Sequence, residues 1–406
     1  FNRYKFDDFK PYILKSTNYG KSWDIQNSGI ERNSFVRVVR EDKVKEGLLY
    51  AGTERGIYLS SDGGLNWYKW QRNLPIVPIT DLVVHQNDLV VATQGRGFWI
   101  FDDLTPLHEI SDNLKPKNVH MFDVEDNHKV LYSAMRRQGL LGKNPYYGTE
   151  IKYFIRDYDP ADSLIMSIEI RDDEGSLVRS FSSSSDYKSK KIDLKQGYSS
   201  LRWGGDVEGF VPPKGVMTPR GSDGYIESFN VIPGKYNVKF TYGDYSKSSE
   251  FNILPDPRSS VTDNSYNAKG NLLNKIHADI KSIYESLDRM QDVRSQLNNL
   301  KDRLQIGYED IKNLSEETIS LVDKTESQLI SPRQKTFQDV INFRNQLDAQ
   351  FLDLLNTVNG NIPPITKGEM ERFDDLHQKW VTIKKTYDDV LENVKSINNL
   401  IIENSV

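Results

Sequence analysis

Two arginines, Arg55 and Arg96, are the best candidates for ligand binding, because each directly precedes a glycine in a turn between strand-like runs. The glycine lets the backbone bend sharply, which presents the preceding side chain at the tip of the turn. A guanidinium group there can donate paired hydrogen bonds to a carboxylate or bind a peptide backbone. Alternatively, the arginines form ion pairs with a neighbouring part of the repeat and only stabilise it. The ligand-binding candidates at this end of the repeat are Arg55, Arg96, Glu54, Gln94 and Arg32.

Carboxylates near the same turns raise the question of glycoside hydrolysis. That reaction needs two carboxyl groups a few ångströms apart, one acting as acid and the other as base or nucleophile. Glu54, Asp81 and Asp103 could each face this end, but nothing in the sequence pairs two of them. The sequence also has no phosphate-binding glycine loop, no Gly-x-Ser-x-Gly and no Walker motif. We therefore predict no catalytic residue and no cofactor in this chain.

The histidines give no metal-binding pattern, since none of the six forms a His-x-His or His-x-x-x-His pair. The nearest approach to a ligand cluster is the segment from His120 to His128, which encloses three acidic residues. Metal sites need several such ligands at fixed spacing. A solvated acidic loop explains this segment better, and we predict no metal site.

A repeated turn organises the first hundred residues. The octads Ser16-Thr17-Asn18-Tyr19-Gly20-Lys21-Ser22-Trp23 and Ser60-Ser61-Asp62-Gly63-Gly64-Leu65-Asn66-Trp67 both fit Ser-x-Asp/Asn-x-Gly-x-x-Trp. The Asp or Asn side chain can bond its own turn backbone, the glycine supplies the bend, and the tryptophan is an apolar anchor. The octad resembles the Asp-box (BNR) repeat of sialidase-like and sortilin-like β-propellers. Its structural residues are Ser16, Asn18, Gly20, Trp23, Ser60, Asp62, Gly64 and Trp67.

Short strands surround the second octad at the spacing of one propeller blade, four strands in about 40 residues. The expected strands are residues 35–39, 48–52, 56–59 and 67–70, and then 79–84, 89–92 and 98–101. Residues 1–105 thus read as the final two to three blades of an Asp-box β-propeller. Because two or three blades cannot close a ring, the remaining blades are expected upstream or in another chain. Residues 106–144 read as a connector.

The rest of the chain divides where the apolar periodicity changes. In residues 145–257, six or seven alternating strands predict an Ig-like β-sandwich, with residues 204–224 as a long loop. In residues 258–406, apolar stripes at helical spacing predict an antiparallel bundle of three or four helices. The stripes span residues 276–304, 311–329, 337–358 and 373–401, and Thr366 with Glu369 forms a capping box at the start of the last helix.

Composition limits the class of protein. The chain has 406 residues, a net charge of -5 and no cysteine, which excludes disulfides and gives no reason to expect nucleic acid as a partner. No apolar run is long enough to span a membrane. The chain starts at Phe1 without a methionine, so we expect a mature or truncated piece of a longer protein.

The order of these parts resembles the C-terminal portion of large sortilin-like BNR-repeat proteins of Bacteroidota, often labelled "glycosyl hydrolase". The closest matches are the exit segment Gly-Arg-Gly-Phe-Trp-Ile-Phe-Asp-Asp-Leu-Thr-Pro-Leu at residues 95–107 and the residues Gly-Lys-Asn-Pro at 142–145. The sandwich resembles FlgD-type Ig modules in the Asp-x-x-Gly-x-x-Val-Arg pattern from Asp172 to Arg179. The resemblance implies an exported protein, either secreted or held at the cell surface or outer membrane.

We expect a non-catalytic binding and scaffold protein. Its propeller would capture a peptide, protein or glycan, and the C-terminal domains would dock it onto a larger assembly, such as an outer-membrane complex. The rival is a glycoside hydrolase, sialidase-like or xyloglucanase-like, whose active site lies in blades upstream of this piece.

Overall fold

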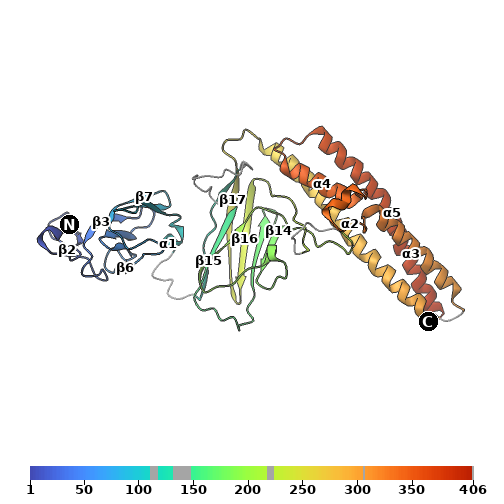
Figure 1. The fold of residues 1–406 in the computed structure, drawn as a ribbon, viewed down its shortest axis with the longest axis horizontal. Helices are drawn as coiled ribbons and strands as arrows, with labels where there is room; N and C mark the ends of the chain where they lie inside the picture. Colours follow the sequence, from blue (N-terminus) through green and yellow to red (C-terminus); the bar gives the residue numbers. More distant parts are fainter. Residues whose placement is uncertain (110–117, 131–147, 217–223, 305–306, 405–406) are drawn as a thin grey trace. The chain divides into compact units, whose positions relative to one another are not determined.

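A computed structural model describes residues 1–109, 118–130, 148–216, 224–304 and 307–404. The chain separates into two compact units, Phe1–Asn118 and Val119–Val406. The first unit is built of β-sheets, and the second combines β-sheets with long helices (Figure 1). The prediction of β-structure followed by helices is confirmed at this level. The described strands form five open sheets, and none of these closes into a barrel or a propeller.

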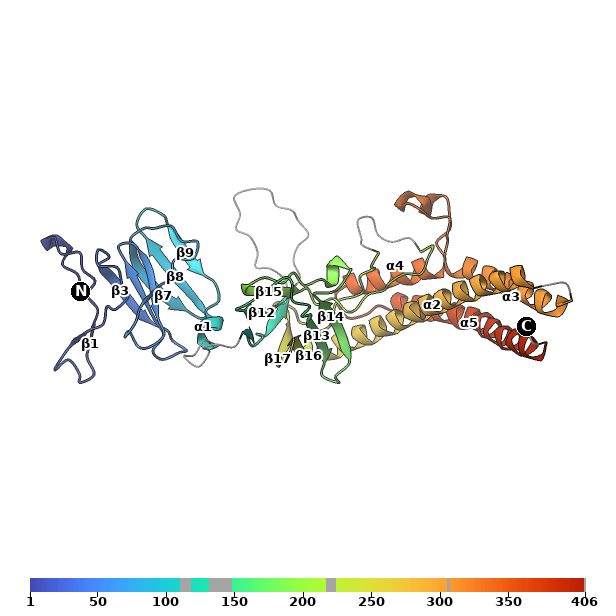
Figure 2. The same cartoon turned by 90° about the horizontal axis from the view of Figure 1, so that it is seen from below.

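Two antiparallel sheets make up most of the first unit (Figure 2). The first sheet contains β3 (Val36–Glu41), β4 (Leu49–Thr53), β5 (Gly56–Ser60) and β6 (Tyr68–Lys69). The second sheet contains β7 (Ile79–His85), β8 (Asp88–Thr93) and β9 (Phe98–Phe101). The unit also holds the small pair β1 (Leu14–Lys15) and β2 (Asp24–Ile25), a 3-10 turn at Tyr4–Phe6 and the short helix α1 (Thr105–Glu109).

The first and second sheets pack against each other through one apolar core. Tyr50 and Ile57 from the first sheet are buried with Ile79 and Leu82 from the second. Gly52 allows the close approach, since a Cβ at this position would lie only 2.7 Å from a methyl carbon of Ile79. Trp70 and Phe101 stack between the sheets with ring centroids 4.4 Å apart. The strands of the first and second sheets therefore share one core.

Both Asp-box octads form the same hydrogen-bonded turn. The amide of Gly20 donates to Ser16 Oγ at 2.7 Å, and the amide of Gly64 donates to Ser60 Oγ at 3.0 Å. The Asn18 and Asp62 side chains each accept from the amide four residues later, at 2.9 Å in both turns. Gly20 and Gly64 have φ values of 85° and 92°, a region that L side chains rarely adopt. These turns depend on contacts within eight residues.

Two further sheets face each other in the second unit. One contains β10 (Val119–Met121), β12 (Thr149–Ile155) and β15 (Gly197–Trp203). The other contains β11 (Asn127–Lys129), β17 (Tyr245–Pro255), β16 (Gly234–Tyr242), β13 (Met166–Asp172) and β14 (Leu177–Ser182). Their inward side chains form one core that includes Ile151, Trp203 and Phe240. Thus β10 and β11, which lie in the predicted connector, pair with strands of this sandwich.

Four helices follow, and Figure 1 shows them running alongside one another. They are α2 (Asp263–Arg303), α3 (Glu309–Leu329), α4 (Leu347–Gly360) and α5 (Lys367–Glu403). The predicted capping box at Thr366 and Glu369 is present, with the Glu369 amide donating to Thr366 Oγ1 at 3.2 Å. The third stripe was predicted to run as one helix from Phe337. Instead, residues Phe337–Ile341 form a short 3-10 turn, and α4 begins only at Leu347.

The segment between β15 and β16 joins the sandwich to the helices. Sequence analysis predicted a loop at residues 204–224, but the two ends of this segment pair through bridges at Asp206 with Asn230 and Phe210 with Ile226. Phe210, Ile226 and Phe229 are buried in the apolar core of the helices. We call its two paired ends, residues 206–216 and 224–230, the bridging hairpin. Residues 217–223 lie outside the described part.

Candidate functional site

The two turns that carry the predicted binding arginines share a backbone design. Thr53 Oγ1 donates to the carbonyl of Gly56 at 2.9 Å, and Thr93 Oγ1 donates to the carbonyl of Gly97 at 2.6 Å. The second turn contains one residue more, so Glu54-Arg55 in the first sheet corresponds to Gln94-Gly95-Arg96 in the second. The threonine closes each turn, which places Arg55 and Arg96 at the tips.

Neighbours within the first sheet hold two of the five candidate residues. Arg55 Nε lies 3.9 Å from Glu31 Oε2, and Glu31 also accepts from Lys69 Nζ at 2.9 Å. The hydrogen bond from Lys69 lowers the pKa of Glu31 below its usual value. Glu54 accepts from Arg37 Nε at 2.9 Å and from Arg37 Nη2 at 2.6 Å. Glu54 is therefore an ion-pair partner rather than an unengaged acid.

The other three candidates, Arg32, Gln94 and Arg96, have exposed side chains. Arg32 precedes β3. The backbone amide of Gln94 donates to the carbonyl of Pro78 at 2.9 Å, which anchors the turn. The Arg96 carbonyl accepts from Trp99 Nε1 at 3.1 Å, which fixes the backbone at this tip. Exposed guanidinium groups such as those of Arg32 and Arg96 can bind carboxylates or phosphates.

The three carboxylates considered for glycoside hydrolysis have different neighbours. Asp81 pairs with Arg40 across the two sheets at 2.8 Å, and Glu54 pairs with Arg37. The Asp103 carboxylate accepts from the amide of Thr105 at 3.0 Å, at the start of α1. Each of these three carboxylates thus makes a structural interaction. Within the described residues, no group of three or more histidine or acidic side chains could hold a metal ion.

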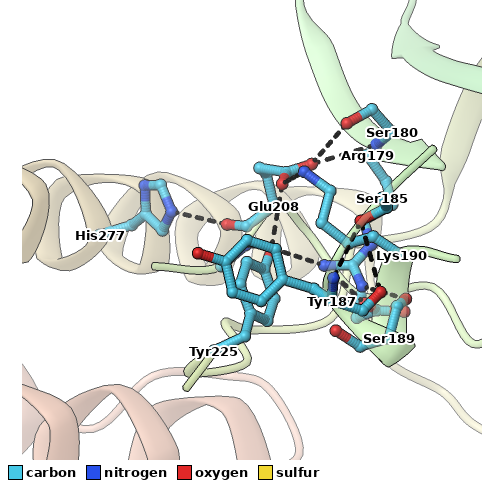
Figure 3. Close-up of polar contacts among 11 residues, drawn as sticks. Arg179, Ser180, Ser185, Tyr187, Ser189, Lys190, Glu208, Tyr225 and His277 are labelled. Atoms are coloured by element: carbon cyan, nitrogen blue, oxygen red, sulfur yellow. Dashed lines mark hydrogen bonds and ion pairs between the residues drawn. The ribbon is translucent and has the colours of Figure 1, made fainter. Parts of the chain in front are cut away.

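A partly buried polar cluster that the sequence did not predict lies in the second unit (Figure 3). Its centre is Glu208 on the bridging hairpin, and we call it the Glu208 cluster. Glu208 accepts from the amide of Ser180 at 3.1 Å, from the hydroxyl of Tyr225 at 3.0 Å and from Lys190. Burial acts to raise the pKa of Glu208, but the contacts with Lys190 and Tyr225 outweigh it and hold the pKa below its usual value.

Arg179 supplies the second cation of this cluster and is only 1% exposed. It donates to the Tyr225 hydroxyl at 2.9 Å and to the carbonyl of Ser189 at 2.9 Å, and it pairs with Asp206 at 3.2 Å. Its guanidinium also lies over the rings of Phe181 and Tyr225, at 5.2 and 5.3 Å from their centroids. Burial, the largest influence, raises the pKa of Tyr225, so this hydroxyl stays protonated.

The Glu208 cluster acts as a structural joint. Arg179 and Lys190 balance Asp206 and Glu208, so these four groups carry no excess charge that would attract a ligand. His277 on α2 makes a 2.9 Å hydrogen bond from Nε2 to the carbonyl of Glu208, which ties the cluster to the helices. Because Arg179 is buried, removing its acidic partner Asp206 would be costly, since it leaves a buried charge uncompensated. The sequence contained one signal for this cluster, namely a charged residue, Arg179, within an apolar strand.

Comparison with known proteins adds little detail. No protein-family model matches the chain, and no curated protein matches it. Two solved structures from B. thetaiotaomicron show a distant likeness at 10% sequence identity and a TM-score of 0.20 each. They are the extracellular domain of the putative one component system BT4673 and that of the putative hybrid two component system BT4673. The likeness covers 60% and 61% of this chain but only 28% and 29% of those chains, so this chain spans less than a third of their length.

None of the helices in the described part of the chain is both long enough and apolar enough to cross a bilayer.

Proposed function

We propose that this chain is the C-terminal part of a sortilin-like, BNR-repeat protein that is exported and acts at the cell surface or outer membrane as a non-catalytic binding and scaffold protein. In this proposal the first and second sheets are propeller blades, and the turns at Arg55 and Arg96 bind a peptide, protein or glycan. The second unit, an Ig-like sandwich with a helical bundle, docks the captured ligand onto a larger assembly.

The observation that carries the proposal is a shared pairing pattern in the first and second sheets. Val36 pairs with Thr53 in one sheet, and Ile79 pairs with Thr93 in the other. In both sheets the register then shifts by one residue, at Arg37 and at Thr80. A β-bulge repeated at the same step supports a common repeat unit rather than two unrelated sheets.

The stacking of the sheets supports a longer array. The face of the first sheet that carries Tyr50 and Ile57 is covered by the second sheet. The corresponding face of the second sheet carries Val83, Val90, Ala92, Phe98 and Ile100 together with the polar residues Asp81 and His85, and Phe98 and Ile100 are 80% and 57% exposed. A further sheet that repeats the observed packing would cover this face, as in a propeller.

The test of the binding role is the double variant Arg55→Ala/Arg96→Ala in the full-length protein. Wild type and variant are used to capture partners from solubilised cell envelope, followed by quantitative mass spectrometry. Each lost charge-assisted hydrogen bond removes roughly 1.5–3 kcal/mol, so partners held by this face should be depleted from the variant.

A matched control is Lys21→Ala/Lys43→Ala, which removes the same charge from exposed positions. Lys43 lies in the β3–β4 connection, at the opposite end of the first sheet from Arg55. The control should retain the wild-type partners. Identical partner sets from the wild type and the arginine variant would exclude the binding role of this face, and a lowered melting temperature with intact capture would assign the arginines to stability.

A further inference from the structure

A cavity of about 280 Å³ lies in the second unit, where the sandwich meets the helices. It is bounded by the end of β11, by the residues that follow the bridging hairpin, by the first turns of α2 and by the end of α4. The lining residues are Lys129, Val130, Asn230, Ile232, Tyr266, Lys269, Asn359, Gly360, Asn361, Ile362 and Pro363. This size suits a small ligand rather than a drug-sized one.

The lining carries an excess of positive charge. Lys129 from the sandwich and Lys269 from α2 are its charged residues, and the set of lining residues just named contains no carboxylate. Lys269 is only 6% exposed, which is unusual for a lysine. Glu369 on α5 interacts electrostatically with Lys269. However, Glu369 already accepts hydrogen bonds from Thr366 and from the Asn361 side chain.

The hydrogen bonds of the two ammonium groups leave donors for a ligand. Lys269 Nζ donates to the carbonyls of Asn359 and Asn361 at 2.8 and 2.5 Å, and Lys129 Nζ donates to the carbonyl of Val231. The two ammonium groups carry three N–H donors each. Among partners in the described part of the chain, three of these six donors are used, and three remain for a ligand. The side-chain amide of Asn359, which lines the cavity, is also held in place, because its Oδ1 accepts from the backbone amide of Asn230 at 3.0 Å.

Burial and a like charge disfavour the charged form of Lys129. Burial, and to a smaller extent the nearby charge of Lys269, together lower the pKa of Lys129 to about 8. Burial likewise lowers the pKa of Lys269, against the opposing effect of Glu369. The other titratable group in the lining is the hydroxyl of Tyr266. An anion between the two ammonium groups would relieve this repulsion and replace part of their lost hydration.

We propose that this cavity binds a small organic anion, whose carboxylate or phosphate group lies between Lys129 and Lys269. The apolar part of the lining, formed by Ile232, Ile362 and Pro363, would accommodate a short hydrocarbon portion of the ligand. This site lies in the second unit and uses none of the residues of the propeller proposal, so either proposal can fail alone.

Isothermal titration calorimetry on the whole chain tests the site, with butyrate, inorganic phosphate and ethyl phosphate as the probes. Tighter binding of butyrate would identify a carboxylate ligand, and tighter binding of either phosphate would identify a phosphate ligand. Lys269→Met and Lys129→Met keep most of the side-chain volume and remove the charge. Each should weaken binding by about tenfold or more, since each removes charge-assisted hydrogen bonds. Lys239→Met, at an exposed position on β16, is the control and should bind like the wild type.

A second measurement needs only the wild-type protein. Because a bound anion raises the lysine pKa values, binding at pH 8 should take up protons, and the binding heat should then differ between Tris and HEPES buffers. Circular dichroism melting shows whether each variant is folded, and if both unfold, the wild-type measurement decides. Absence of binding of all three probes at millimolar concentration, binding heats that do not depend on the buffer, or wild-type affinity in both folded lysine variants would overturn the proposal.

Discussion

The two Asp-box turns have the same local structure but differ in what covers them. Both close through the serine hydroxyl and the Asn or Asp side chain, with nearly equal hydrogen-bond lengths. Yet Trp67 is 2% exposed, whereas Trp23 is 58% exposed. The motif therefore determines the turn, and its surroundings determine whether the tryptophan is buried.

The cover over Trp67 comes from the segment just after the first octad. Trp67 Nε1 donates to the carbonyl of Gln26 at 3.0 Å, and the Trp67 amide donates to the carbonyl of Ser28 at 2.8 Å. Gly29 packs so closely that a Cβ there would lie 2.0 Å from the Trp67 carbonyl oxygen. Trp23 instead folds back on its own turn, with Nε1 donating to the carbonyl of Gly20 at 3.2 Å. One copy of the motif thus links two parts of the chain, and the other is local.

The largest expected difference between the turns concerns these tryptophans. Trp67→Ala should destabilise the first unit by about 3–5 kcal/mol, the usual cost of truncating a buried tryptophan. That loss should lower its melting temperature by more than about 10 °C. Trp23→Ala should change stability by no more than about 0.5 kcal/mol, because its side chain is largely exposed. Scanning calorimetry of the whole chain measures both changes in stability, with the second unit as an internal reference.

Equal destabilisation by the two tryptophan variants would contradict this comparison. It would mean that Trp23 is covered in solution by a part of the molecule outside the described contacts.

Replacing the polar residues of the turns should cost less stability than Trp67→Ala, and the cost should be similar in the two turns. Asp62→Ala should cost about 1–2 kcal/mol, since it removes acceptors for Ser60 and Asn66. Asn18→Ala removes the matching acceptors for Ser16 and Ser22 and should cost about 1 kcal/mol. The same calorimetric measurement applies. If Asn18→Ala had no effect, the first turn would not depend on its own side-chain bonds.

The smallest difference should appear only in acid. Burial acts to raise the pKa of Asp62, but hydrogen bonds from the Asn66 amide and side chain outweigh it and lower that pKa. A carboxyl whose pKa is lowered by folding stabilises the protein above the unfolded value of about 3.9, and this stabilisation is lost as the pH falls through the folded value. Asn18 cannot titrate, so only the second turn should weaken in acid.

The variant Asp62→Asn isolates this effect, because the other carboxylates titrate equally in both proteins. At pH 7 it should be less stable than the wild type by up to about 1 kcal/mol. As the pH falls below the lowered pKa of Asp62, the two melting temperatures should converge. An offset that stays constant from pH 7 to acid would show that the charge of Asp62 contributes nothing.

Features that depend on neighbouring residues were predicted well from the sequence. The octads, the hairpin turn at Gly243-Asp244 and the capping box at Thr366 all act over a few residues, and the structure contains each of them.

Features that depend on distant partners were missed. The bridging hairpin is rich in glycine and proline and reads as a loop, because the helices that bury its aromatic residues begin more than thirty residues after its end. Arg179 reaches Tyr225, 46 positions away, and the cavity lysines belong to the sandwich and to α2. No local pattern encodes such contacts. Arg55 and Glu54 were placed correctly in their turn, but their ion pairs with Glu31 and Arg37 could not be read from spacing alone.

The bridging hairpin has a mechanical consequence. It leaves the sandwich after β15 and returns to it at β16, while Phe210, Ile226 and Phe229 are embedded among the helices. Tension that pulls the helices away from the sandwich would therefore have to extract three apolar side chains and also break the link from His277 to Glu208. Such an arrangement distributes a load over two strands and a packed core instead of over the single connection between β17 and α2.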